Sequence, residues 1–351
     1  MRGGRARALG NDVSAPVARL EATYILPLRV DGESSPEWLD DLSEYLTWLA
    51  DRLEVLVVDG SPAGAFAQHH ARWAGRVGHV PPDADQLTLN GKVGGVLTGV
   101  RLAHSERLVI ADEDVRYDDG SLRRLIGRLA EAEVVRPQNH FVPMPWHARW
   151  DTPRILINRM TGGDWPGTLG VRRSLLVAAG GYDGAVLFEN LELVRTIRAL
   201  GGRELVAFDL YVSRRPPEAG HFWSQRVRQA YDELARPLRL AAWLALLPGG
   251  ILLTARRWWA AALAVLFAAT ALAEAGRRRA GGRAVFSVSA SLMTPLWLIE
   301  RSIAAWLAVG ARLLLGGMPY RGGILSRAAT PSRVLELRHA AMRAEARWTS
   351  A

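Results

Sequence analysis

Three adjacent carboxylates are the residues of this chain that most clearly could do chemistry. Asp112, Glu113 and Asp114 follow the apolar run Leu108 to Ala111, which predicts a short buried strand. Open α/β sheets bind their ligands at such strand ends. Neighbouring carboxylates repel one another unless solvent or a cation neutralises them, and their hard oxygens suit Mg²⁺ or Mn²⁺, which often also holds phosphates. Two interpretations stay open at this point, a metal and phosphate site or a solvated acidic turn.

Two more carboxylates begin a predicted helix further along the chain. Residues 180–202 read as a turn followed by an amphipathic helix, and its first turn carries Glu189, Asn190 and Glu192. This layout can direct carboxylates into a cleft, and it equally satisfies the positive end of a helix dipole.

Four other positions are candidates for a site on weaker grounds. Asp59 follows the apolar run 53–58, where an aspartate could also cap a turn, and Lys92 opens a predicted glycine-bearing helix, 90–104. Gln225 and Arg228 lie near one face of a predicted helix, 221–234, which could be an ordinary exposed face.

The segments between these candidates predict the sheet that would position them. Apolar strands at 22–28, 53–58, 108–111 and 134–135 alternate with helices at 36–52, 90–104 and 122–132. This alternation predicts a doubly wound, mostly parallel α/β sheet. Residues 136–170 have no clean period and are predicted to be an irregular binding loop or lid. His69 and His70 are expected at an exposed helix end, because no third ligand stands at zinc spacing.

Composition excludes several kinds of site. The 351 residues include no cysteine, which rules out disulfides, zinc–thiolate centres and thiol nucleophiles. The net charge of +9 indicates an anionic partner. Nucleic acid is not expected, because the basic residues form no continuous stripe with interleaved aromatics. The basic N-terminus has no apolar segment and is not a secretory signal, so the first domain is expected in the cytosol.

The composition changes after Pro237, where three uncharged runs follow at 240–255, 258–273 and 284–299. Each is shorter than the roughly 20 residues of a perpendicular span, but flanking arginines can extend it. The arginine distribution predicts a transmembrane hairpin with both ends in the cytosol, followed by an interfacial helix that reaches Leu315. A soluble helical subdomain with an apolar core is the alternative. The predicted division is an arm at 1–20, a catalytic domain at 21–235, the membrane region at 236–316 and a cytosolic tail at 317–351, which includes a short amphipathic helix.

Taken in order, these motifs resemble those of family-2 glycosyltransferases with the GT-A fold, including ceramide and hopanoid glucosyltransferases, over roughly residues 22–325. VVDGS resembles the motif whose aspartate, here Asp59, contacts the nucleotide base. GKVGGVLTGV resembles the helix that brings a lysine, here Lys92, to the nucleotide. ADEDVRYDDGSL resembles the DxD motif, which gives Asp112 and Asp114 the metal and diphosphate roles.

The second half of the chain continues the resemblance. GGYDGAVLFENLEL resembles the segment that bears the acceptor base. QRVRQ resembles the QxxRW motif, in which Gln225 and Arg228 match the nucleotide-sugar-binding positions. GGMPYRGGIL resembles the segment that closes many of these chains after their membrane helices.

The resemblance implies a membrane-bound, inverting glycosyltransferase at the cytosolic face of the inner membrane. It would use Mg²⁺ or Mn²⁺ and a nucleotide-diphospho-sugar, foremost a UDP-sugar, and its acceptor would be a lipid or another amphiphile. Trp146, Trp150 and Trp165 could line the sugar or acceptor site, or simply pack.

Two departures bear on this reading. Asn190 stands where the family has its basic aspartate, and an amide cannot take a proton at neutral pH. Either Glu189 or Glu192 is then the base, or the acceptor is already ionised, or the chain is inactive. Gln229 replaces the tryptophan of QxxRW, which favours a single transfer over a processive synthase. The main alternative is a non-catalytic membrane protein that binds nucleotide-sugars or assists another transferase.

Overall fold

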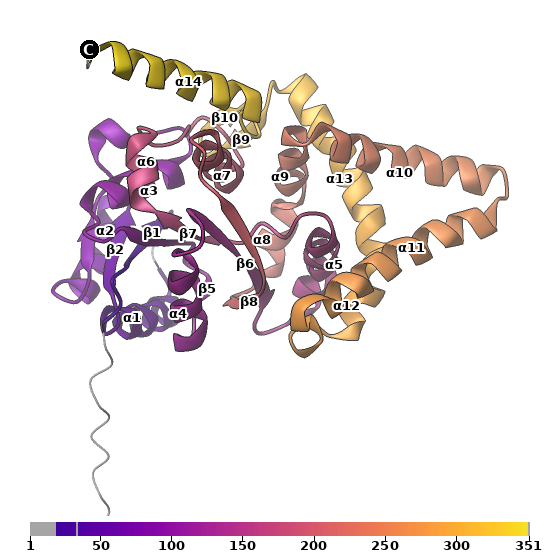
Figure 1. Ribbon diagram of the computed structural model, residues 1–351. Coiled ribbons are helices and arrows are strands. Elements are labelled where there is room, and N and C mark those ends of the chain that lie inside the picture. The colour runs from indigo at the N-terminus through magenta and orange to yellow at the C-terminus, as the bar shows by residue number, and fades with distance from the viewer. Residues whose placement is uncertain (1–18, 33, 350–351) are drawn as a thin grey trace, which may run out of the picture.

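The computed structural model describes residues 19–32 and 34–349, so most of the predicted arm at 1–20 lies outside the described residues (Figure 1). Its centre is an eight-stranded sheet in the order β3-β2-β1-β4-β7-β6-β8-β5. The pairs β1–β2, β1–β4, β2–β3 and β6–β8 are parallel, whereas β7 runs antiparallel to β4 and β6, and β5 to β8. The strands are β1 (Thr23–Leu28), β2 (Glu54–Asp59), β3 (Gly78–Val80), β4 (Arg107–Ala111), β5 (Val115–Arg116), β6 (Val134–Phe141), β7 (Thr168–Arg172) and β8 (Glu204–Arg214).

Helices cover both faces of this sheet (Figure 1). Helices α1 (Pro36–Ala50) and α4 (Asp119–Arg128) pack on one face. Helices α3 (Gly91–Leu102), α6 (Arg173–Ala178) and α7 (Glu189–Ala199) pack on the other. Strand β1 shows why both faces are apolar, since Tyr24 and Leu26 join the first core and Ile25 the second. Helix α2 (Ala63–Trp73) packs on β3 through Trp73 and His79, and the 3₁₀ turn η1 (Ala84–Gln86) packs on α3. The predicted doubly wound, mostly parallel α/β sheet is confirmed.

The C-terminal part is helical and extends away from the sheet. Helices α10 (Pro237–Ala255) and α11 (Trp259–Arg278) form a hairpin that reaches the far right of Figure 1. Two helical stretches, Pro237–Ala255 and Trp259–Ala284, are long and apolar enough to cross a membrane, with 6% and 11% of their apolar windows buried. The remaining elements are η3 (Arg279–Ala284), α12 (Val288–Leu292), α13 (Thr294–Leu314), β9 (Met318–Tyr320), β10 (Gly323–Leu325) and α14 (Ser332–Thr349), the helix predicted for the tail.

Three local predictions differ from the structure. The stretch 136–170 is not irregular, because β6 continues to Phe141 and α5 (Trp146–Met160) follows, with Pro153 inside it. Helix α5 is buried on several sides, so its sequence has no amphipathic period. The third apolar run is not one helix, since Pro295 cannot donate a backbone hydrogen bond and starts α13 anew. The helix predicted at 221–234 is divided into α8 (Ala219–Ser224), α9 (Arg226–Tyr231) and η2 (Asp232–Ala235).

Candidate active site

A cleft of about 1110 Å³ opens where the carboxyl ends of the parallel strands meet. Its walls include the ends of β1 and β2, the acidic segment after β4, the start of α7 and the end of β8. The opposite wall comes from α5, α9, η2, α10 and α13. The cleft therefore lies between the sheet domain and the helical region.

The acidic segment and the helix starts are brought together through Lys92. Its Nζ lies 2.5 Å from Asp112 Oδ1 and 2.7 Å from Glu189 Oε1. Burial opposes the charge of Lys92, but the two carboxylates raise its pKa well above the usual value. A close packing of α3 on β1 makes this possible, because a Cβ on Gly95 would lie 3.0 Å from Pro27 Cβ. Sequence positions far apart thus form one charged group in the cleft.

Asp114 has an incomplete set of partners. Arg214, at the end of β8, donates to Asp114 Oδ2 over 2.6 Å and reaches Asp112 Oδ2 at 3.5 Å. Asp114 Oδ1 is buried and has no hydrogen-bond partner. Burial raises the pKa of Asp114. Loss of hydration at its carboxylate and the adjacent charges of Asp114 and Asp112 raise the pKa of Glu113 to about 7, although part of this residue is exposed. An orphaned carboxylate oxygen in a group of repelling carboxylates fits a divalent cation with oxygen ligands.

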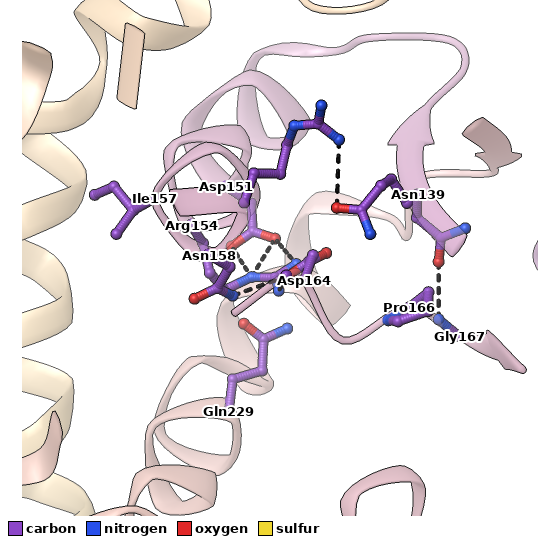
Figure 2. A network of polar contacts seen from close by, with 12 residues as sticks. Asn139, Asp151, Arg154, Ile157, Asn158, Asp164, Pro166, Gly167 and Gln229 are labelled. Atoms are coloured by element: carbon purple, nitrogen blue, oxygen red, sulfur yellow. Dashed lines mark hydrogen bonds and ion pairs between the residues drawn. The ribbon is translucent and has the colours of Figure 1, made fainter. Parts of the chain in front are cut away.

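A turn at Pro166 and Gly167 fixes the position of Asp112. The backbone N–H of Asp112 donates to the Gly167 carbonyl at 2.8 Å, and a Cβ on Gly167 would lie 2.6 Å from Asp112 Oδ2. The Gly167 N–H in turn donates to the Asn139 side chain at 2.8 Å (Figure 2). Asn190 donates its amide to the Pro166 carbonyl at 3.0 Å. Asn190 therefore holds this turn, which a carboxylate could not do because it has no N–H to donate.

Of the two candidate bases, the structure brings one to the cleft. Glu189 lines it beside Lys92. Glu192 is fully buried and does not line the cleft, and its Oε2 accepts the Thr330 backbone N–H at 2.6 Å. Burial raises the pKa of Glu192. The structure thus places Glu192 in a supporting position beneath the segment before α14.

Gln225 and Arg228 both line the cleft. Arg228 Nη1 donates to Gln225 Oε1 at 3.1 Å. The Arg228 guanidinium lies 4.8 Å from the ring centre of Tyr320 in β9, so the QRVRQ and GGMPYRGGIL segments meet at this wall. Trp165 also lines the cleft, whereas Trp146 and Trp150 pack against Trp223 outside its lining.

Asp59 is not brought to the cleft, although its neighbours Val58 and Gly60 line it. Its buried carboxylate accepts hydrogen bonds from His69 Nδ1 at 2.6 Å, from His79 Nε2 at 3.1 Å and from the Ser61 N–H at 2.9 Å. Burial alone would raise the pKa of Asp59, but these hydrogen bonds lower it to about 2.

The prediction of an exposed helix end was wrong for His69, which is fully buried, and right for His70. The third group, His79, comes from β3, and no spacing within α2 could reveal it. Asp59, His69 and His79 could together hold a metal ion by distance.

The cleft also contains charged residues that sequence reasoning missed. Asp232 lines it, and burial, together with nearby Glu189, raises the pKa of Asp232 to about 7 against the effect of Arg228. A buried network in the far wall joins Arg154 to Asp151 at 2.9 Å and to Asp164 at 2.8 Å (Figure 2). Sequence reasoning missed this network because it predicted a loop at 136–170. Asp151 and Arg154 instead lie one turn apart on helix α5.

No family model and no curated protein sequence matches this chain. Among solved structures, it is similar to the mannosyltransferase PcManGT from Pyrobaculum calidifontis in complex with GDP-Man and Mn²⁺, at 20% identity and a TM-score of 0.46, covering 93% of this chain and 85% of that one. It is also similar to S. aureus TarS 1-349 in complex with UDP-GlcNAc, at 14% identity and a TM-score of 0.40, over 58% of this chain and 61% of that one. A third is glucosyl-3-phosphoglycerate synthase from Mycobacterium tuberculosis with Mn²⁺, UDP and phosphoglyceric acid, at 19% identity and a TM-score of 0.37, over 57% and 72%. At TM-scores below 0.5 these likenesses carry no argument about function, which rests on the geometry of the cleft.

Proposed function

We propose that this chain is a membrane-bound, metal-assisted glycosyltransferase that moves a sugar from a nucleotide-diphospho-sugar to an amphiphilic acceptor with inversion. The observation that carries the proposal is the buried, unpartnered Asp114 Oδ1 beside Asp112 in a cleft at the strand ends. Such a pair suits a divalent cation, Mg²⁺ or Mn²⁺, that would neutralise charge on a leaving diphosphate.

The chain's own cations support a polyanionic donor such as a UDP-sugar. Lys92 and Arg214 lie directly beside the two aspartates, and Arg228 and Gln225 line the same cleft. The planar fork of arginine matches phosphate oxygens. The contact of Asp59 with the nucleotide base stays a prediction. For this contact to form, the Asp59 carboxylate would have to leave His69 and His79.

Glu189 is the proposed general base. It would take the proton of the acceptor hydroxyl while the new C–O bond forms and the bond from the anomeric carbon to the diphosphate breaks. Lys92 Nζ lies 2.7 Å from Glu189 Oε1 and so holds this carboxylate at the cleft. Asp232 is the second candidate for the general base. Burial and the charge of nearby Glu189 raise the pKa of its carboxyl to about 7.

The membrane part of the proposal comes from the α10–α11 hairpin. Both helices are uncharged over most of their length and expose large apolar side chains such as Leu238, Leu263 and Phe267. Exposed apolar surface of this extent needs a partner, and a bilayer suits two helices of spanning length. The cleft would then lie at the cytosolic face of the inner membrane, next to a lipid acceptor.

The test is nucleotide release by the full chain in detergent, with a panel of UDP- and GDP-sugars, Mn²⁺ and lipid acceptors. We expect acceptor-dependent release for one donor and its loss when EDTA is added. A chain that binds UDP with Mn²⁺ but releases no nucleotide from any donor sugar would instead be a nucleotide-sugar-binding protein or a partner of another transferase. Asn190 at the position of the family's base is the observation that favours this second candidate.

A further inference from the structure

The charges along the cleft change from acidic at one end to basic at the other. Lys92 links Asp112 to Glu189, and Glu189 is close enough to Asp232 to raise its pKa. Arg228, Arg236 and Arg301 act on Asp232 from the other side and lower its pKa. The proposed base thus stands between the metal end and an arginine-rich end.

The arginine-rich end, formed by Arg236, Arg239 and Arg301, has too little negative charge. All three guanidinium groups share Glu233, at 3.2 Å from Arg236, 3.3 Å from Arg239 and 2.8 Å from Arg301. Glu233 and Arg301 are 1% and 3% exposed, so water does little to screen this group. Even with Asp232 counted beside Glu233, two carboxylates face four guanidinium groups, because Arg228 also acts on Asp232. A buried surplus of positive charge calls for a counter-ion.

Hydrogen bonding leads to the same conclusion. Arg301 Nε and Nη1 and Arg236 Nε are buried without an acceptor. Buried donors are nearly always satisfied in proteins, and those of a charged group are the costliest to leave alone. Arg228 in the same wall donates to neutral Gln225 and has no carboxylate within ion-pair distance among the described residues.

Apolar surface adjoins this arginine-rich end. Arg236 precedes α10 directly, Arg239 lies in its first turn, and Arg301 lies within α13. Leu238, which directly precedes Arg239 in the first turn of α10, is 88% exposed. A ligand whose anionic head is bound by Arg239 would therefore have exposed apolar surface of α10 close to its tail.

We propose that Arg236, Arg239 and Arg301 form a subsite for a phosphate-type anion on the acceptor, so that the acceptor is an anionic amphiphile rather than a neutral lipid. The assignment of this anion to the acceptor rests on the proposed function. The binding of an anion at these arginines does not depend on that function and can be measured without any sugar transfer.

The experiment is calorimetric titration of the full chain in detergent, with UDP and Mn²⁺ in excess so that the donor end is filled. The probes are dihexanoyl phosphatidic acid, dihexanoylglycerol and inorganic phosphate. The variants are Arg236→Gln and Arg239→Gln, whose side chains are 19% and 25% exposed and therefore tolerate change better than Arg301. Arg128→Gln is the matched control. Arg128 lies at the end of α4 outside the cleft lining, is 24% exposed and pairs with Asp209 of β8.

We expect phosphatidic acid to bind and the neutral lipid not to bind, with each cleft variant weakening binding about tenfold and the control leaving it unchanged. Weaker binding of inorganic phosphate than of phosphatidic acid supports the amphiphilic acceptor. Equal binding of the two supports the anion subsite but overturns the amphiphile in favour of a soluble phosphate ester. Equal binding of the neutral lipid, or unchanged binding in both cleft variants, overturns it. Anion binding without turnover for any donor would count against the proposed transferase alone.

Discussion

At the scale of single residues, the two glutamates of α7 differ in what each contacts. Glu189 faces the cleft and Lys92, whereas Glu192 accepts the Thr330 N–H away from it. Glu189→Gln should lower the transfer rate by about 10²–10⁴ while donor binding changes little, because only proton acceptance is lost. Rates and UDP affinity of the purified variant check this.

The matched control is Glu192→Gln, in which an amide oxygen can still accept the Thr330 N–H. Its rate should stay within about threefold of the original, since Glu192 does not line the cleft. A loss of transfer in Glu192→Gln with normal rates in Glu189→Gln would reverse the assignment.

The acidic segment predicts a pH-dependent effect of metal. The folded chain raises the pKa of Glu113 from 4.5 to about 7, so ionising it costs stability in the folded state. Protonated Glu113 therefore contributes fully to the free energy of unfolding below pH 4.5, and this contribution is lost as the pH rises through 7. A bound cation removes the repulsion, so Mn²⁺ should raise the melting temperature more at pH 8 than at pH 5. An equal shift at both values, by differential scanning fluorimetry, would contradict the repulsion.

At the scale of elements, the close contact between α3 and β1 places Lys92 in the cleft. Gly95→Ala would put a methyl group 3.0 Å from Pro27 Cβ and should lower the free energy of unfolding by about 1–3 kcal/mol. Gly91→Ala, where nothing lies within 4 Å, is the control and should be close to neutral. Chemical denaturation of both variants measures the difference, and equal effects would show that the contact is not tight.

The elements also show which parts of the site sequence reasoning can reach. Asp112, Asp114, Lys92 and Glu189 were all predicted, because short motifs at strand ends and helix starts have local signals. Arg214 and His79 were missed because their roles depend on which strands become neighbours. The buried helix α5 hid the arginine and aspartate network of the far wall, since burial on several sides removes the helical period.

Asn190 illustrates a different limit. In the sequence it is only a missing base, whereas in the structure its amide donates to the Pro166 carbonyl and supports the turn that holds Asp112. The departure from the family's motif therefore has a physical role in this chain.

At the scale of the whole molecule, the cleft adjoins the α10–α11 hairpin, which we propose to span the membrane. The chain has no cysteine, so single introduced cysteines report their location directly. Arg257→Cys, between α10 and α11, should react with an impermeant maleimide added outside intact spheroplasts. Arg76→Cys, near β3 in the sheet domain, should react only after lysis. Protection of both until lysis would contradict a spanning hairpin.

The most direct test of the central claim is calorimetric binding of UDP with and without Mn²⁺ to the wild-type chain and to Asp114→Asn. Asp119→Asn, an exposed aspartate on α4, is the control. We expect Mn²⁺ to strengthen UDP binding to the wild-type chain about 100-fold. Asp114→Asn should abolish this gain in affinity, and the control should retain it. UDP binding that ignores Mn²⁺, or a Mn²⁺ effect that survives in Asp114→Asn, would contradict the claim that this carboxylate holds a metal on the donor's phosphates.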